Sequence, residues 1–194
     1  NIPIWGEVEL AYRHDKGTVI GITGTNGKTT TTSLTYDIMK RHAKKALLVG
    51  NIEIPYTGYA LESDKDSVTV AEISSFQLET MVTFKPHVTA ILNITPDHLD
   101  RHKTLENYIA IKESITKNQD ENDFCVLNYN DPVLREFGKT PRCKVIFFSS
   151  SKELESGVFL RGDTMIIKEN GVETPVCTTK DTTLVGMNNY ENIM

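Results

Sequence analysis

Short apolar runs alternate with longer segments of mixed polarity along most of the chain. The apolar runs, rich in Val, Ile and Leu, predict six strands over residues 18–22, 46–49, 68–73, 88–94, 124–128 and 144–148. The segments between them predict helices over residues 28–42, 75–82, 104–118 and 131–137. Regular alternation of strands and helices is typical of α/β proteins, so we expect a mostly parallel sheet with helices on both faces.

The pattern changes after Ser151, where the runs become shorter and more polar. In the segment MIIKENGVETPV, Asn170 and Gly171 separate two alternating stretches, which is the sequence signal of a type I′ β-turn. We therefore expect antiparallel hairpins at the edge of the sheet toward the C-terminus. The first 16 residues, which include IPIWGEVELAY, are expected to form a connector or docking helix that leads into the sheet.

The composition suits one folded domain and excludes several classes of partner. The chain has 194 residues, of which 39% are hydrophobic, which is enough for one buried core. Its net charge is -5 and its basic residues are dispersed, so we expect no nucleic-acid partner. No apolar run approaches the roughly 20 residues of a membrane helix, so we expect no membrane partner and a cytoplasmic protein, which we take to be a monomer. Cys125, Cys143 and Cys177 are widely spaced and predict neither a disulfide framework nor a zinc site.

The stretch GITGTNGKTTTT, residues 21–32, is the strongest chemical signal in the chain. It links the first predicted strand to the first predicted helix, an arrangement in which backbone N–H groups and the helix N-terminus hold phosphate. Lys28 is placed to reach terminal phosphates, and the Thr29 hydroxyl to bind a magnesium ion. With Gly24 and Gly27 the loop is G-x-x-G-K-T, shorter than the pattern G-x-x-x-x-G-K-[ST]. It predicts a P-loop-like mononucleotide-binding fold; the alternative is a glycine turn with an ordinary helix cap.

Acidic residues and histidines follow the third and fourth predicted strands. Glu72 ends the run SVTVAEI and is the best candidate for a magnesium ligand, because the carboxyl ends of such strands face the ligand crevice. The alternative for Glu72 is a solvated carboxylate. The segment NITPDHLDRH then brings together Asp97, His98, Asp100, Arg101 and His102. A loop this dense in titratable side chains favours a functional site.

Other titratable residues give weaker signals. His14, His42 and His87 stand alone and are interpreted as surface or structural residues. Lys112 lies among isoleucines in ENYIAIKESI, and its spacing alone favours a surface lysine whose stem covers apolar neighbours. Neither a Ser-His-Asp nor a Cys-His arrangement for a catalytic nucleophile is evident.

Six motifs occur along the chain in the order GTNGKTTT, GNIEIP, AEISSFQLE, NITPDHLDRH, YIAIK and GMNNYEN. With them the chain resembles the central ATP-binding domain of the Mur ligases, from about Ile2 to its last residue. The resemblance implies that residues 1–16 connect to an N-terminal domain and that residues 17–194 form the ATP-binding domain. It also implies that N- and C-terminal domains of the same protein lie outside this sequence. The segment SSFQLE is similar to the branch of the family that adds D-glutamate to UDP-N-acetylmuramoyl-L-alanine.

The resemblance implies a nucleotide and metal site by position. The phosphates of ATP would be held by the loop and the first helical turn, that is by Gly24, Thr25, Asn26, Gly27, Lys28, Thr29 and Thr30. Thr29 and Glu72 match magnesium ligands, and His98 matches the histidine at a second metal. Lys112 matches a lysine that is carbamylated in this family, which turns a cation into an anionic group that supports the metal. Lys28, His98 and Lys112 are thus the implied catalytic residues.

Further positions match residues that contact the substrates. Asn51 and Ser74 match positions that contact the muramoyl substrate, and Asn189 and Asn192 match asparagines that hold the adenine. The chain departs from the family pattern at two of its positions. Glu53 stands where the family usually has glycine, and Asn188 stands where it usually has histidine.

The implied activity is ATP-dependent amide-bond formation. ATP would phosphorylate the L-alanyl carboxylate to an acyl phosphate, and the amine of D-glutamate would displace phosphate. Two alternatives stay open on the residues alone: a kinase or simple NTPase, which the loop by itself would support, and a nucleotide-binding module without turnover. We expect these 194 residues to fold and bind nucleotide weakly but not to turn over, because the two implied neighbouring domains are absent.

Overall fold

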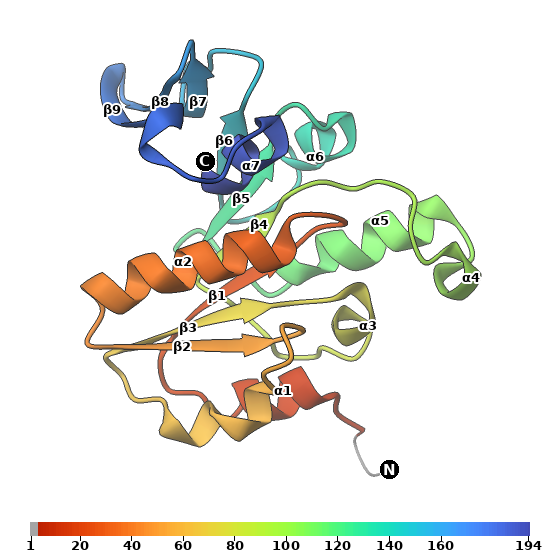
Figure 1. Ribbon diagram of the computed structural model, residues 1–194. Helices are drawn as coiled ribbons and strands as arrows, with labels where there is room; N and C mark the ends of the chain where they lie inside the picture. The colour runs from red at the N-terminus through yellow and green to blue at the C-terminus, as the bar shows by residue number, and fades with distance from the viewer. Residues whose placement is uncertain (1–3) are drawn as a thin grey trace.

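A nine-stranded sheet organises the chain (Figure 1). The computed structural model describes residues 4–194; the first three residues of the expected connector lie outside the described residues. The strands are β1 (Thr18–Thr23), β2 (Lys45–Gly50), β3 (Ser67–Glu72), β4 (Val88–Ile91), β5 (Phe124–Asn128), β6 (Lys144–Ser149), β7 (Gly157–Arg161), β8 (Thr164–Glu169) and β9 (Val172–Thr178). Their order in the sheet is β2-β3-β1-β4-β5-β6-β7-β8-β9.

Seven α-helices and four short 3-10 helices accompany the sheet within residues 4–194. The α-helices are α1 (Glu7–Tyr12), α2 (Lys28–His42), α3 (Ser75–Leu78), α4 (Leu99–His102), α5 (Leu105–Glu113), α6 (Pro132–Phe137) and α7 (Met187–Ile193). The 3-10 helices are η1 (Tyr56–Gly58), η2 (Ala60–Glu62), η3 (Ser114–Thr116) and η4 (Thr179–Asp181). Among the residues described, no helix combines the length and the apolar character needed to cross a membrane.

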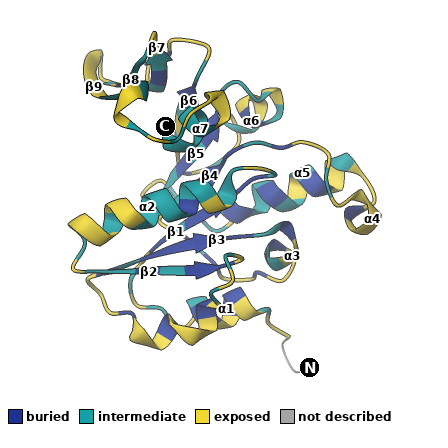
Figure 2. Cartoon of the chain, in the orientation of Figure 1, coloured by how far each residue is buried: buried dark blue, intermediate teal, exposed yellow. Residues whose placement is uncertain are grey.

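The two faces of the sheet are covered by different helices, because successive side chains of a strand point to opposite faces. In β1, Val19 joins the larger core under α1, α3, α5 and α6, whereas Ile22 joins the smaller core under α2. Figure 2 shows the central strands largely buried and the outer hairpin strand β9 exposed. Central strands of this kind carry apolar residues on both faces, which explains their nearly continuous hydrophobic runs.

The expected sheet type is confirmed. Pairing is parallel from β2 to β7 and antiparallel through β7, β8 and β9. The turn between β8 and β9 is the one expected: Asn170 and Gly171 have φ angles of 52° and 79°, the left-handed values that a type I′ turn requires. The first segment forms a helix as expected, α1, which packs Val8 and Ala11 into the larger core.

Three expected elements are shorter than their patterns predicted. The strand expected over residues 88–94 ends at Ile91, because Asn93 turns away to bond the glycine-rich loop. The helix expected over residues 75–82 ends at Leu78, and the chain then unwinds toward α1. The helix expected over residues 104–118 becomes a 3-10 turn at Ser114, whose hydroxyl bonds the Ile111 carbonyl and so competes with the helical pattern.

Glu9 joins α1 to the loop before β4. Its side chain is fully buried and accepts hydrogen bonds from the backbone N–H groups of Val82, Thr83 and Phe84 and from the Thr83 hydroxyl. Arg13 also donates to it at 2.9 Å. Burial alone would raise the pKa of Glu9, but these hydrogen bonds outweigh burial and lower the pKa to about 2. The pattern of apolar residues gave no sign of this contact.

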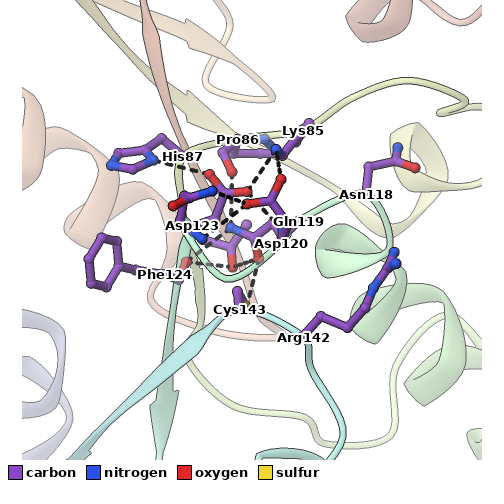
Figure 3. A network of polar contacts seen from close by, with 12 residues as sticks. Lys85, Pro86, His87, Asn118, Gln119, Asp120, Asp123, Phe124, Arg142 and Cys143 are labelled. Carbon is purple, nitrogen blue, oxygen red and sulfur yellow. Dashed lines mark hydrogen bonds and ion pairs between the residues drawn. The ribbon is translucent and has the colours of Figure 1, made fainter.

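A polar network ties the loops at the amino ends of β4, β5 and β6 (Figure 3). Lys85 lies 2.5 Å from Asp120 and 3.2 Å from Asp123, and His87 lies 3.1 Å from Asp123. The buried amide of Gln119 donates to two backbone carbonyls in the same loops. This edge is opposite to the carboxyl ends of the strands, so His87 has a structural position, as its isolation in the sequence suggested.

Glu53 lies in a strained turn after β2. The backbone N–H of Gly50 bonds the Ile54 carbonyl at 2.7 Å and closes the turn, which places Glu53 at a φ of 64°. In this left-handed region a Cβ atom crowds the following carbonyl, at a cost of roughly 1–2 kcal/mol. The departure from the family's glycine at this position therefore has a structural consequence.

We expect Glu9→Gln to lower the free energy of unfolding by about 3 kcal/mol at pH 7, because the native state loses a buried, fully bonded carboxylate. The pKa of Glu9 falls from 4.5 to about 2 on folding, so its stabilisation is present above pH 4.5 and is lost as the pH falls toward 2. Urea unfolding between pH 7 and pH 2 measures the difference, with the exposed Glu121→Gln as the matched control. A difference that persists unchanged at pH 2 would contradict this assignment.

We expect Glu53→Gly to raise the free energy of unfolding by about 1 kcal/mol, because glycine adopts the left-handed conformation without steric cost. Thermal unfolding should show a midpoint about 2–4 °C higher. Glu53→Ala is the matched control, since alanine keeps the Cβ atom and should give no comparable gain. An equal gain in both variants would point to the charge of Glu53 rather than to its backbone.

Candidate functional site

The glycine-rich loop runs from the end of β1 to the start of α2. Gly24 has a φ of 152°, and a Cβ atom there would lie 3.1 Å from the Leu92 Cβ, so the loop passes close to the chain after β4. Gly27 has a φ of 83° and directly precedes α2. The free N–H groups of the first helical turn, which includes Thr30, point toward the loop and make it a favourable place for an anion.

Lys28 folds back over this loop. Its Nζ donates to the Gly24 carbonyl at 3.0 Å and to the Thr25 carbonyl at 2.8 Å. Burial lowers the pKa of Lys28, while the charges of Glu72 and Asp97 act in the opposite direction. The ammonium group is thus held at the loop by carbonyl oxygens, where a phosphate can replace them.

Asn93 holds the loop in place from the segment that follows β4. Its side-chain oxygen accepts from the Asn26 N–H at 2.8 Å and its amide donates to the Asn26 carbonyl at 3.1 Å. Its own carbonyl accepts from the Thr25 N–H at 2.9 Å. The Thr25 hydroxyl lies 3.2 Å from the Tyr108 hydroxyl on α5. The loop is therefore shaped by β4 and α5 as well as by its own glycines.

Glu72 ends β3 with its carboxylate buried, which excludes the alternative of a solvated side chain. The Thr29 hydroxyl donates to one carboxylate oxygen at 2.8 Å, and the Asn51 amide donates to the other at 2.9 Å. Three segments far apart in the sequence thus meet at one carboxylate. β3 lies beside β1 in the sheet, so its carboxyl end is necessarily next to the phosphate loop.

The donors around Glu72 fit a magnesium ion. A carboxylate and a hydroxyl oxygen lie in contact, and magnesium prefers such oxygen ligands together with phosphates and water. Within residues 4–194, no group of three or more His, Cys, Asp or Glu side chains is arranged to hold a metal ion. The site would therefore depend on phosphate and water oxygens to complete a metal's coordination. His98 is exposed and contacts Asp97 at 3.4 Å, without forming such a group with Glu72.

Lys112 is buried, and the expectation of a surface lysine from its spacing is wrong. Its Nζ donates to the Gly24 carbonyl at 2.8 Å and lies 4.8 Å from the centre of the Tyr108 ring. Burial, and then the nearby charge of Lys28, lower the pKa of Lys112 to about 7. The helix α5 faces the carboxyl ends of β1 and β4, so its inward side chains reach the loop rather than solvent.

A cavity of about 240 Å³ lies beside the phosphate loop, and five of the expected site residues line it. It is lined by Lys28, Asn51, Ser74, Ser75, Phe76, Asp97, His98, Tyr108 and Lys112. Ser74 caps α3 and forms a reciprocal pair of hydrogen bonds with Gln77, which fixes the start of that helix. Residues from the phosphate loop, from the segments that follow β2, β3 and β4, and from α5 therefore border one space.

A second cavity, of about 270 Å³, lies on the other side of the loop, against α7. Asn192 lines it and packs against Gly27, while Asn188, the departure from the family pattern, also faces it. Asn189 is not among the lining residues; its amide bonds the Val185 carbonyl at 2.9 Å and its oxygen accepts from Asn192. Of the two expected adenine contacts, only Asn192 faces this cavity.

Sequence reasoning missed three residues that shape the site. Tyr108 and Asn93 contact the loop from α5 and from the end of β4. Glu191 holds α7 through bonds with Asn128, Asn130 and Ser150. Their position inside the motifs NITPDHLDRH, YIAIK and GMNNYEN was the only signal that could have marked them.

The chain was compared with known families and structures. Residues 22–194 match the sequence pattern of the family described as Mur ligase middle domain. A UDP-N-acetylmuramoylalanine--D-glutamate ligase from Lachnoclostridium phytofermentans is 53% identical over 193 residues, covering 100% of this chain and 42% of that protein. The protein of the same name from Lachnospira eligens is 48% identical over 192 residues, covering 99% of this chain and 43% of that protein.

Solved structures show the same fold. MurF from Acinetobacter baumannii has a TM-score of 0.68 at 19% identity, covering 94% of this chain and 42% of that one. MurF ligase from Thermotoga maritima, solved in complex with ADP, has a TM-score of 0.65 at 20% identity, covering 95% of this chain and 45% of that one. This chain spans less than half the length of the relatives it matches. The family pattern covers nearly all of it, and the chain belongs to the Mur ligase family, as a middle domain.

Proposed function

We propose that this chain is the ATP-binding part of a ligase that joins D-glutamate to UDP-N-acetylmuramoyl-L-alanine during synthesis of peptidoglycan precursors. The observation that carries the proposal is the meeting of the phosphate loop, Glu72 and Lys112 at one edge of the sheet. The names of the relatives at 53% and 48% identity support this choice of substrates.

The chemistry requires activation of a carboxylate. An amine does not displace oxide from a carboxylate, so the oxygen must first become a leaving group. ATP transfers its γ-phosphoryl group to the alanyl carboxylate and leaves as ADP, and the resulting acyl phosphate is attacked by the amine of D-glutamate. The amide bond forms as the carbon–oxygen bond to phosphate breaks, and the amine loses a proton.

The residues of this chain act mainly by position and charge. Lys28 and the N-terminus of α2 stabilise the negative charge that spreads over the transferring phosphoryl group. Glu72 and Thr29 would hold magnesium, which when bound neutralises phosphate oxygens. Asn51 lies between Glu72 and the cavity, where it can orient the acceptor carboxylate. The adenine would lie in the second cavity, against Asn192.

In a carbamylated form, Lys112 would also help to stabilise the charge of the transferring phosphoryl group. The positive charge of Lys28 lies close to Lys112 and disfavours the protonated form of the Lys112 amine. Reaction of the neutral amine with carbon dioxide gives a carbamate and releases a proton, so a repelling cation becomes an anion beside Lys28. The carbamate would then hold metal and water near the phosphates, together with His98, which also lines the cavity.

The proposal predicts ADP formation that depends on both substrates. The full-length protein that contains this chain should form ADP from ATP and magnesium only when UDP-N-acetylmuramoyl-L-alanine and D-glutamate are both present. Lys28→Ala should lower the rate at least about a hundredfold and abolish ATP binding by calorimetry, because it removes a charge from the phosphates. Lys40→Ala, at the exposed far end of α2, is the matched control. Phosphate release without any amine would instead indicate an NTPase.

The lowered pKa predicts that Lys112 carbamylates near neutral pH. With ¹³C-labelled bicarbonate, a carbamate signal in the NMR spectrum should grow as the pH rises through about 7, because the neutral amine is the reactive form. Lys112→Arg should lack the signal, and the exposed Lys117→Arg should retain it. A signal that survives Lys112→Arg would assign the carbamate to another amine.

A further inference from the structure

The structure assembles a row of serine, histidine and glutamate that the sequence did not reveal. Ser75 is the first residue of α3, His102 is the last residue of α4, and Glu79 follows α3. The Ser75 hydroxyl oxygen lies 3.0 Å from His102 Nε2, and His102 Nδ1 lies 3.2 Å from Glu79 Oε1. The sequence showed no arrangement for a catalytic nucleophile, and this row of different composition becomes visible only in the folded chain, where Ser75 and Glu79 both lie against His102.

The row connects two different spaces. Ser75 lines the 240 Å³ cavity beside the phosphate loop, together with Lys28 and Lys112. His102 and Glu79 line an outer groove of about 570 Å³ between α3 and α5. Ser75 and His102 are only 3% and 4% exposed, so their contact is shielded from water. A buried hydrogen bond of this kind fixes the direction of a hydroxyl group.

The imidazole ring is held by its neighbours. It stacks on Phe76 with ring centres 5.5 Å apart and packs against Tyr108 at 5.3 Å. Within the described residues, His102 Nδ1 has no aligned hydrogen-bond partner, so Glu79 acts on it through its charge at close range. Arg101 bonds Glu79 at 2.6 Å, and this bond lowers the pKa of Glu79 and keeps the carboxylate ionised.

The charge of Glu79 selects one tautomer of His102. A carboxylate next to Nδ1 favours a proton on that nitrogen, which leaves Nε2 as an acceptor. The Ser75 hydroxyl then donates to Nε2, and the lone pairs of its oxygen stay available to the cavity. Ser75 thus offers an oriented hydrogen-bond acceptor in a space where Lys28 and Lys112 are donors.

We propose that Ser75 contacts the second substrate, by accepting a hydrogen bond from the attacking amino group of D-glutamate, and that His102 and Glu79 are positioning residues that orient it. This proposal rests on the proposed ligase function. Carboxylates and phosphates suit the cationic side of the cavity, whereas an amine needs an acceptor for its N–H group while its lone pair faces the acyl carbon. An oriented serine oxygen meets that need without adding charge.

Steady-state kinetics of the full-length protein tests the proposal. Ser75→Ala should raise the KM for D-glutamate about tenfold, an effect of the size expected for one lost hydrogen bond, and leave the KM for ATP unchanged. His102→Phe keeps the stacked ring but removes the bond, and should raise the same KM. His102→Gln keeps an acceptor near Ser75 and should restore it toward the original value. Ser114→Ala is the matched control, because it removes a hydroxyl that bonds the backbone carbonyl of Ile111.

The possible outcomes distinguish a failure of the role of Ser75 from a failure of the proposed ligase function. If the unmodified full-length protein forms no ADP in response to D-glutamate, the proposed ligase function itself is overturned. An active protein in which Ser75→Ala leaves the KM for D-glutamate unchanged would overturn the role of Ser75. A rise in the KM of every substrate, accompanied by a lower thermal midpoint, would also overturn it, because it would show that the row serves only folding. Failure of His102→Gln to restore the KM would overturn the positioning role of His102.

Discussion

The parallel pairing of β1 with β3 on one side and β4 on the other is the constraint on which the site depends. Parallel strands end at the same edge, so whatever follows them must meet there. The phosphate loop follows β1, Glu72 ends β3, and Asn93 follows β4. The alternation of side chains adds a second condition, because Glu72 points to the face covered by α2, on which Thr29 lies. One pairing pattern therefore produces both the anion site and the carboxylate beside it.

Two lysines and one buried carboxylate gather at this edge of the sheet. Lys28 and Lys112 both bond the carbonyl of Gly24, and each has its pKa lowered by burial. Glu72 and Asp97 oppose the charge of Lys28, Asp97 opposes that of Lys112, and Glu72 is itself held by two neutral donors. Two buried ammonium groups that share one carbonyl oxygen raise the free energy of the folded state unless an anion binds beside them. The same feature makes the site receptive to a nucleotide phosphate and to chemical modification of a lysine.

The supporting contacts come from a wider part of the chain than the motifs. α1 is anchored by Glu9 to the loop that leads into β4, and the network around Asp123 fixes the same, amino end of that strand. α7 is held by Glu191 against the ends of β5 and β6, where it walls the second cavity. These polar contacts hold loops at the ends of the strands, and the apolar core ends where they lie. The cavities are therefore defined by buried polar groups as much as by the sheet.

The sequence by itself determined the fold class, most strand positions, the phosphate loop and the position of Glu72, because each depends on local signals: apolar runs, glycines and the residue at a strand end. It did not determine that Lys112 is buried, since a lysine among isoleucines has the same spacing on either face of a helix. It also did not reveal the contacts of Glu9, Asn93 and Tyr108, or the row of Ser75, His102 and Glu79. These depend on which segments pack together, and the partners lie from 23 to 83 residues apart in the chain. Only the tertiary structure decides such pairs, because burial and hydrogen-bond partners are properties of the packed layers and not of any one segment.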